Sequence, residues 1–287
     1  MPSRAQRRLA HAGRALAPLQ ASAAAAAIAP PDPPASSAAE LSPIPSIDVS
    51  SLFGEDLDAK LHTAREIAAA CEDIGFFSIY NHGVPREVIA AAWEQTAAFF
   101  ALPEATKLDG TTMTDDYPYG YLPLGGEKLA AGKQHELGSD DDSGEVDEPP
   151  GDLNESFSIG PPTEAWGAPQ TKWPREPTAF KAAWTTYYQA MEVLSAGILR
   201  AFALALELPE GWFEDKIDEH RCALRTLNYP ELAADDPLVA APKPGQLRAG
   251  AHTDYGTLTL LLQGVGGEAH AVSVTCSEPL RWIGRRP

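Results

Sequence analysis

RAGAHTDYGTLTL, residues 248–260, is the stretch of this sequence that decides the fold. It places an imidazole, His252, and a carboxylate, Asp254, two residues apart at the start of an extended segment rich in β-branched residues. Side chains two positions apart on a strand point to the same face, so both can bind one ion while Thr253 faces away. The spacing therefore predicts part of a metal site at the beginning of a strand.

An imidazole and a carboxylate on one face are two of the three protein ligands in the 2-His-1-carboxylate triad of non-haem Fe(II) sites. Such a triad leaves coordination positions open for a co-substrate and oxygen. The pair alone is weakly diagnostic, because the chain has 7 histidines and 40 acidic residues. The alternative is a hydrogen-bonded pair in a turn or at a strand end. Of the other histidines, we expect His82 in a hydrogen-bonded turn and His62 and His220 facing solvent.

Composition limits the classes of protein to which the chain can belong. Its 287 residues suffice for one large domain or two small ones with a substantial core. The formal net charge of -18 argues against nucleic acid and anionic membranes as partners, since both attract basic proteins. The 3 cysteines have no paired spacing, which argues against a disulfide framework or a zinc site and favours a reducing compartment. No apolar stretch is long enough to cross a bilayer. We expect a monomer.

Residues 1–43 differ in composition from the rest of the chain. Four arginines stand among Ala, Ser and Pro within the first 14 residues, and no acidic residue precedes Asp32. An Arg-rich, acid-poor composition is typical of transit peptides for plastids or mitochondria. The alternative is a disordered Ala- and Pro-rich tail without an address, which leaves the protein in the cytoplasm.

Turn and periodicity signals predict the elements that follow this tail. Asp58 is the expected N-cap of a helix that ends at Gly75. Further along the chain, the acidic run 133–152 lacks the ligand periodicity of a calcium loop. We expect this run to be a solvated surface insertion. The expected strands are 44–49, 76–80, 155–159, 222–229 and 258–263. Two further helices are expected, one from the turn at 81–85 to about Phe100 and one from Ala179 to about Leu206.

Several motifs occur in the order found in one enzyme family. They are Ile44-Pro45-Ser46-Ile47-Asp48, Gly75-Phe76-Phe77, Asn81-His82-Gly83-Val84, Asn228-Tyr229-Pro230 and the stretch around His252. In these motifs the chain, from about Ile44 to Gln263, resembles the 2-oxoglutarate-dependent Fe(II) dioxygenases of the isopenicillin N synthase-like family. Residues 44–115 correspond to the N-terminal region of that family, and residues 116–287 correspond to its jelly-roll region.

The resemblance implies an α+β fold with a mainly β core. That core is a distorted double-stranded β-helix, or jelly roll, with a long backing helix and an N-terminal α/β cap. His252 and Asp254 would bind Fe(II), and Asn228 and Tyr229 would contact the co-substrate 2-oxoglutarate. The implied activity is that of an oxidoreductase that uses O2 to hydroxylate or desaturate a small organic substrate. The metal and its co-substrate carry the chemistry, while the protein supplies orientation and electrostatics.

The resemblance also suggests a substrate role for two tyrosines. Tyr119 and Tyr121 lie where members of the family begin to line the substrate pocket. The alternative for both side chains is packing in the core. The residues themselves do not identify the substrate, because a fold does not determine one.

The sequence departs from the family after Gln263. Members of the family continue with a distal His ligand and an Arg-x-Ser pair that binds 2-oxoglutarate. Residues 264–287 offer neither, since His270 follows His252 by only 18 positions and no arginine there is followed two positions later by Ser. We therefore interpret the chain as C-terminally truncated, with an incomplete barrel and an unpaired edge along 257–262. The alternatives are a catalytically inactive remnant or interaction protein, and a member that uses iron and O2 without 2-oxoglutarate.

Overall fold

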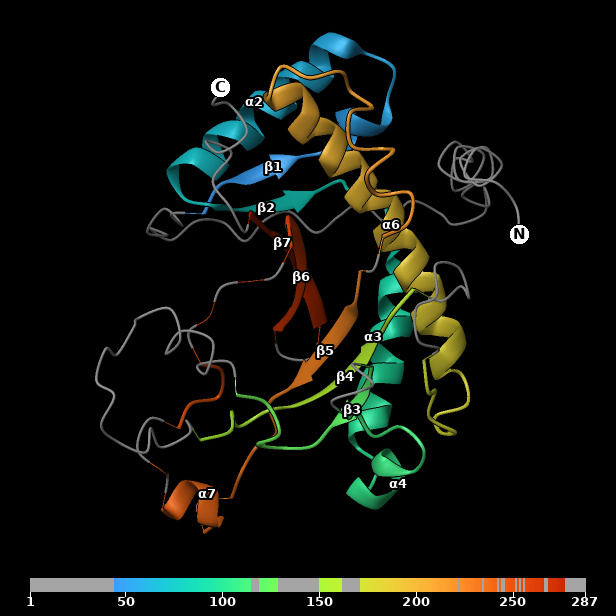
Figure 1. Ribbon diagram of the computed structural model, residues 1–287, viewed down its shortest axis with the longest axis vertical. Coiled ribbons are helices and arrows are strands. Elements are labelled where there is room, and N and C mark those ends of the chain that lie inside the picture. The colour runs from blue at the N-terminus through green and yellow to red at the C-terminus, as the bar shows by residue number, and fades with distance from the viewer. Residues whose placement is uncertain are drawn as a thin grey trace, which may run out of the picture. The chain divides into compact units, whose positions relative to one another are not determined.

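The computed structural model divides the chain into two compact units (Figure 1). The structure describes residues 44–114, 119–128, 150–161, 171–220, 222–233, 235–241, 243, 246–250, 252, 254, 256–265 and 268–276. The tail 1–43 and most of the acidic run 133–152 lie outside the described residues, so the predictions for them are not addressed.

The first unit contains a four-stranded sheet and comprises residues up to Gly83, Val193–Asp218 and Thr257 onward. Its elements are β1 (Ser46–Asp48), the 3-10 helix η1 (Ser50–Phe53), α2 (Leu57–Asp73), β2 (Phe76–Tyr80), β6 (Leu258–Val265) and β7 (Glu268–Cys276). The strand order is β1-β2-β7-β6, with β1 and β2 parallel and the other neighbours antiparallel. The predicted strands at 44–49, 76–80 and 258–263 are confirmed.

Helix α2 begins at Leu57 because Asp56 caps it. The Asp56 carboxylate accepts the backbone N–H groups of Asp58 (3.0 Å) and Ala59 (3.2 Å), which have no acceptor within the helix. The predicted cap, Asp58, is therefore wrong. Asp58 lies in the first turn instead, where its charge is favourable next to the positive end of the helix dipole.

Strand β7 lies where the sequence was taken to depart from the family pattern. It pairs with β2 on one side and with β6 on the other. In the sequence Val272, Val274 and Thr275 are β-branched, and apolar and polar residues alternate along 272–275, a pattern that favours a strand. Within the described residues β6 is the end strand of the sheet, while the edge predicted along 257–262 stays a prediction.

The second unit comprises Val84–Glu192 and Glu219–Gly256 and is built on a three-stranded antiparallel sheet in the order β3-β4-β5. Its elements are α3 (Arg86–Phe100), α4 (Glu104–Leu108), β3 (Gly120–Leu122), β4 (Glu155–Ile159), β5 (Leu224–Asn228), α7 (Pro237–Ala240) and the first half of α6 (Phe180–Ala205). The predicted long helix at 179–206 and the predicted strand at 155–159 are confirmed.

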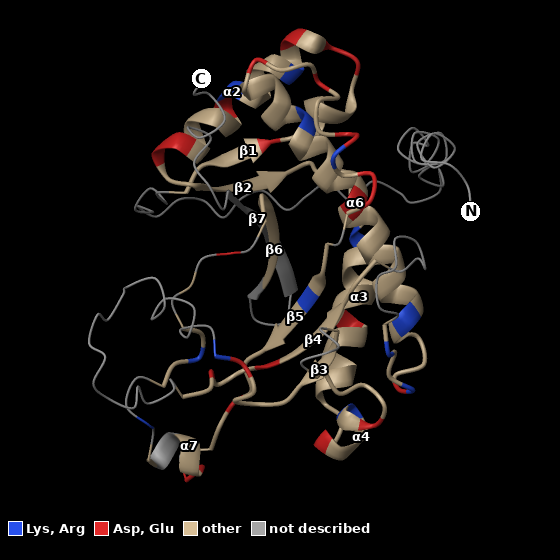
Figure 2. Cartoon of the chain, in the orientation of Figure 1, with Lys and Arg blue, Asp and Glu red and all other residues tan. Residues whose placement is uncertain are grey.

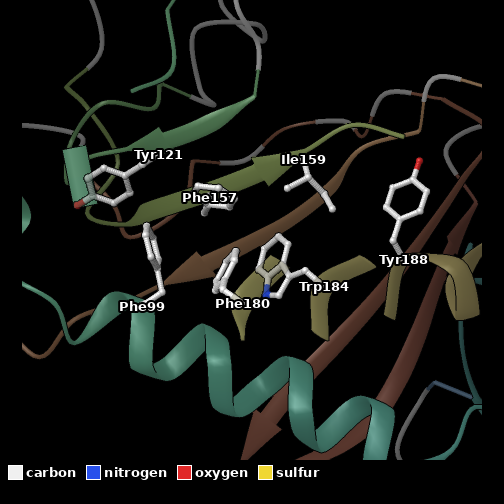
Figure 3. Close-up of a cluster of buried hydrophobic side chains, with 7 residues drawn as sticks. All are labelled: Phe99, Tyr121, Phe157, Ile159, Phe180, Trp184 and Tyr188. Carbon is white, nitrogen blue, oxygen red and sulfur yellow. The ribbon is translucent and has the colours of Figure 1, made fainter. Parts of the chain in front are cut away.

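An aromatic cluster forms the core of the second unit (Figure 3). Its buried members come from α3, β3, β4 and α6 and are Phe99, Tyr121, Phe157, Ile159, Phe180, Trp184 and Tyr188. Phe180 stacks on Trp184 with ring centroids 4.6 Å apart, and Phe157 meets both rings edge-on at 5.2 and 5.5 Å. Edge-to-face and stacked pairs are the favourable arrangements of aromatic rings. This cluster therefore fixes one face of the sheet.

The α+β class is confirmed, since the described residues form both helices and sheets. These residues form two separate sheets and no closed barrel. Strand β6 pairs with β7, its neighbour in the sequence, because a hairpin needs only a short loop. No helix in the described part of the chain is long and apolar enough to span a bilayer.

His220 ties the segment before β5 to helix α6. Its Nε2 lies 2.9 Å from Glu192 Oε1, and the ring stacks on Tyr188, whose hydroxyl donates to the Cys222 carbonyl oxygen (2.8 Å). The prediction that His220 faces solvent is wrong, because the side chain is only 15% exposed. Burial lowers the pKa of His220, but hydrogen bonds to Cys222 and Glu192 outweigh burial and raise this pKa to about 9.

We expect Phe157→Ala to lower the free energy of unfolding by about 3–5 kcal/mol, because it opens a cavity among packed rings. Urea denaturation followed by tryptophan fluorescence measures this. Leu227→Ala, on the neighbouring strand but 39% exposed, is the matched control and should cost less than about 1 kcal/mol. Equal costs for the two variants would contradict the assignment of the core.

The His220–Glu192 pair should make stability depend on pH. Since the pKa of His220 is raised on folding, its contribution is complete below about pH 6.5 and is lost as the pH rises through 9. We expect wild type to exceed His220→Gln in unfolding free energy by about 1–3 kcal/mol more at pH 6 than at pH 10. Urea denaturation of both proteins at the two pH values measures this difference. A gap that stays constant or widens with pH would refute it.

Candidate metal centre

The two predicted metal ligands lie together in the second unit. Nε2 of His252 is 3.5 Å from Oδ1 of Asp254, and both side chains are partly exposed. Neither residue belongs to a regular strand, because β6 begins only at Leu258. The predicted proximity is therefore observed, although neither residue lies in the strand that was expected to produce it.

The His252 ring is held by a backbone acceptor. Nδ1 lies 2.8 Å from the carbonyl oxygen of Gly250. A carbonyl oxygen only accepts hydrogen bonds, so Nδ1 carries the proton and donates it. In the neutral ring the lone pair then resides on Nε2, the atom nearest the Asp254 carboxylate.

This pair fits a divalent cation. A lone pair on Nε2 and a negatively charged oxygen 3.5 Å apart repel each other unless a positive charge lies between them. Metal bonds to imidazole nitrogen and to carboxylate oxygen are each about 2.1 Å, so a single ion can reach both atoms. In the part of the chain that the structure describes, no group of three His, Cys, Asp or Glu residues forms a fuller metal site. Within the described residues the candidate site therefore offers two metal-binding side chains, His252 and Asp254.

The segment that carries His252 is held by the residues just ahead of β4. The backbone N–H of Leu153 donates to the Leu247 carbonyl oxygen (2.8 Å), and Nδ2 of Asn154 donates to the Arg248 carbonyl oxygen (2.8 Å). The backbone N–H of Gly250 donates to Oδ1 of Asp152 (2.9 Å). The irregular segment is thus fixed by hydrogen bonds that do not depend on regular strand pairing.

Asp152 is a residue that sequence reasoning missed. It ends the acidic run 133–152 that was predicted to be solvated, yet it is only 3% exposed. For Asp152 that prediction is wrong, because its carboxylate accepts the buried Gly250 N–H. The available signal was its position three residues before the predicted strand at 155–159, where a run of surface charge should already have ended.

The predicted co-substrate residues Asn228 and Tyr229 do not share a face. Asn228 pairs with Glu155 across β4 and β5, and its Nδ2 donates to Glu155 Oε1 (2.8 Å). Neighbouring positions on a strand alternate between faces, so Tyr229 follows the face of Arg225. Tyr229 is 46% exposed, and partial burial together with the negative charges of Glu127 and Asp152 raises its pKa. Its hydroxyl therefore stays protonated, as a hydrogen-bond donor.

The predicted substrate residue Tyr121 belongs to a buried polar cluster. Its hydroxyl donates to Oε2 of Glu155 (2.5 Å), an atom that also lies 2.6 Å from Nζ of Lys107. Tyr121 is 1% exposed, and burial together with the Glu155 charge raises its pKa. Tyr119 is also buried, and its ring packs so closely on Gly160 that a Cβ at that position would collide with it. The packing favours the core alternative for both tyrosines.

Another charged pair lies on the face of β5 that is opposite the aromatic cluster. Nη1 of Arg225 is 2.8 Å from Oε1 of Glu127, and Nη2 donates to Oγ of Ser156 (2.9 Å).

Acidic residues are spread over both units, on α2 and α4 among other elements (Figure 2). The exclusion of nucleic acid and anionic membranes as partners stays a prediction from composition.

Comparison with known families identifies the N-terminal part of the chain. Residues 44–177 match the family described as non-haem dioxygenase in morphine synthesis N-terminal. This match begins at the residue where the sequence resemblance was taken to begin.

Curated fungal proteins match over a longer range. The 2-oxoglutarate-dependent dioxygenase citB of Monascus ruber is 30% identical over 259 residues, which cover 85% of this chain and 71% of that protein. The 2-oxoglutarate-Fe(II) type oxidoreductase hxnY of Emericella nidulans is 28% identical, with 85% of this chain and 66% of that protein covered. The chain therefore spans about two thirds of the length of these relatives.

Solved structures show the same relationship. A full-length Neurospora crassa protein, solved in complex with alpha-KG and thymine, is 26% identical with a TM-score of 0.63, covering 81% of this chain and 73% of that one. JOX2 in complex with 2OG, Fe and JA is 23% identical with a TM-score of 0.58, covering 81% of this chain and 64% of that one, a likeness of fold alone.

Proposed function

Because this chain belongs to the 2-oxoglutarate-dependent dioxygenases, we propose that it uses Fe(II), 2-oxoglutarate and O2 to hydroxylate or desaturate a small organic molecule. The observation that carries the proposal is the His252–Asp254 pair, 3.5 Å apart, with the imidazole lone pair directed by Gly250. Family membership alone would leave the site of chemistry unassigned, since function depends on particular residues.

His252 and Asp254 hold the metal in this proposal. Bound iron supplies the activation of oxygen and of the keto acid, which no side chain can provide. The imidazole contributes Nε2, while the hydrogen bond from Nδ1 to Gly250 keeps the ring from turning. Asp254 contributes an anionic oxygen that offsets the charge of the ion.

Tyr229 binds and orients the co-substrate. Its protonated hydroxyl can donate a hydrogen bond to a carboxylate of 2-oxoglutarate. Asn228 supports Tyr229 from the opposite face, by holding the end of β5 against Glu155 on β4. We assign Tyr119 and Tyr121 the same kind of supporting role, because their burial keeps them within the core.

The substrate is a small molecule in this proposal, and its identity follows from neither the fold nor the relatives. The Neurospora crassa protein was solved with thymine, and JOX2, on a similar fold, was solved with JA. Both hydroxylation and desaturation begin at a C–H bond of the substrate, so both outcomes remain within the proposal.

One observation favours a second candidate function. The described residues bring only two metal-binding side chains together, one fewer than a facial triad needs. A chain that binds iron weakly would serve as a non-catalytic binding or interaction protein. Metal affinity and succinate formation distinguish the two functions, because the second predicts weak metal binding and no succinate.

We expect the wild-type chain to bind Co(II), a stable substitute for Fe(II), and expect His252→Ala and Asp254→Ala each to weaken binding at least about 10-fold. Each variant removes one of two protein donors. Anaerobic isothermal titration calorimetry measures the Kd. His62→Ala is the matched control, since His62 is 74% exposed and distant in sequence from the site. Wild-type affinity in both site variants would rule out this metal site.

We expect Tyr229→Phe to weaken binding of 2-oxoglutarate to the Co(II)-loaded chain about 10-fold, because a hydrogen bond to a carboxylate is lost. Calorimetry with 2-oxoglutarate gives the Kd of both proteins. Tyr80→Phe, which alters a half-exposed tyrosine of β2, should leave this Kd unchanged. Succinate release from the Fe(II)-loaded protein in air separates 2-oxoglutarate chemistry from a reaction that uses iron and O2 alone.

A further inference from the structure

We propose that Asp152 is a positioning residue for the metal ligand His252 and acts through the backbone of Gly250. The inference rests on the proposed function, in which His252 binds the metal. It assigns the metal site a carboxylate that does not itself touch the ion.

Two hydrogen bonds in series connect the side chains of Asp152 and His252 through Gly250. Oδ1 of Asp152 accepts the backbone N–H of Gly250 (2.9 Å), and the carbonyl oxygen of the same glycine accepts Nδ1–H of His252 (2.8 Å). Gly250 and Asp152 are both buried. The N–H and the C=O of Gly250 flank its two backbone torsions, so bonding both groups fixes the orientation of the carbonyl that holds the imidazole.

A glycine in this position needs such an anchor. Glycine has the largest conformational freedom of any residue, so the direction of its carbonyl group is weakly determined by local sterics. The neighbouring bonds from Leu153 to Leu247 and from Asn154 to Arg248 hold the chain before Gly250, but neither reaches Gly250 itself. The anchor of the Gly250 N–H is therefore the Asp152 carboxylate.

The carboxylate at Asp152 also has an electrostatic consequence. Its negative charge polarises the chain of hydrogen bonds toward the imidazole and makes Nε2 a better electron-pair donor. An amide at the same place would still accept the Gly250 N–H but would carry no charge. Asp152→Asn and Asp152→Ala therefore separate the charge from the hydrogen bond.

The experiment compares these two variants with Asn154→Ala. Asn154 is as deeply buried as Asp152, two residues away, and holds the same segment at Arg248, so this control reports a general loosening of the segment. The first readout is the tautomer of His252 in the metal-free chain, observed by NMR of protein labelled with 15N-histidine. The His252→Ala spectrum assigns the signals. The second readout is the Kd for Co(II).

We expect Asp152→Ala to populate both tautomers of His252 and to weaken Co(II) binding about 10–100-fold, the range typical for loss of an outer partner of a metal-bound histidine. Asp152→Asn should retain the Nδ1–H tautomer and weaken binding less than Asp152→Ala does. Asn154→Ala should retain the tautomer and stay within about 3-fold of wild-type affinity.

A single tautomer together with wild-type Co(II) affinity in Asp152→Ala would overturn the inference. An equal loss in Asn154→Ala would also overturn it, because the effect would then be structural. If wild type does not bind Co(II), the proposed function fails, while the tautomer of the metal-free chain still decides whether Asp152 positions His252.

Discussion

The hydrogen bond from His252 Nδ1 to the Gly250 carbonyl oxygen is the interaction on which the candidate site depends. Without this hydrogen bond the His252 ring could turn and present either nitrogen to Asp254. The lone pair of the ring would then not be directed toward the carboxylate. With this hydrogen bond, Nε2 lies 3.5 Å from the carboxylate. A single backbone carbonyl thus orients the His252 ring so that Nε2 is the nitrogen that faces the Asp254 carboxylate.

Strand β4 connects this site to the core. One of its faces places Phe157 among the aromatic rings, and Glu155 on that face holds Asn228 of β5. The residues just ahead of β4 place Asp152 against Gly250. A rigid, well-packed strand is a suitable support, because binding geometry must be held to within a fraction of an ångström.

The elements predicted correctly are those whose signals are local. The helix ending before Gly75, the strand at 155–159 and the long helix from Phe180 follow from periodicity and from turn residues, which act over a few positions. The cap misplaced at Asp58 is a local error of two residues, whereas two other errors concern long-range partners. His220 was predicted to face solvent because its partner Glu192 is 28 residues away in the sequence. Asp152 was predicted to be solvated because its partner Gly250 is 98 residues away. Strand β7 was not predicted, although its β-branched alternation is local, because it lies beyond the stretch that carries the family motifs.

The sequence by itself determined the family, the two candidate ligands and the order of most helices and strands, since spacing, periodicity and capping chemistry are written into neighbouring residues. Only the tertiary structure decided which nitrogen of His252 is available, which face of β5 carries Tyr229, and that Asp152 is buried rather than solvated. These outcomes depend on which distant backbone groups meet, and a buried N–H or C=O takes whatever partner the fold brings within about 3 Å.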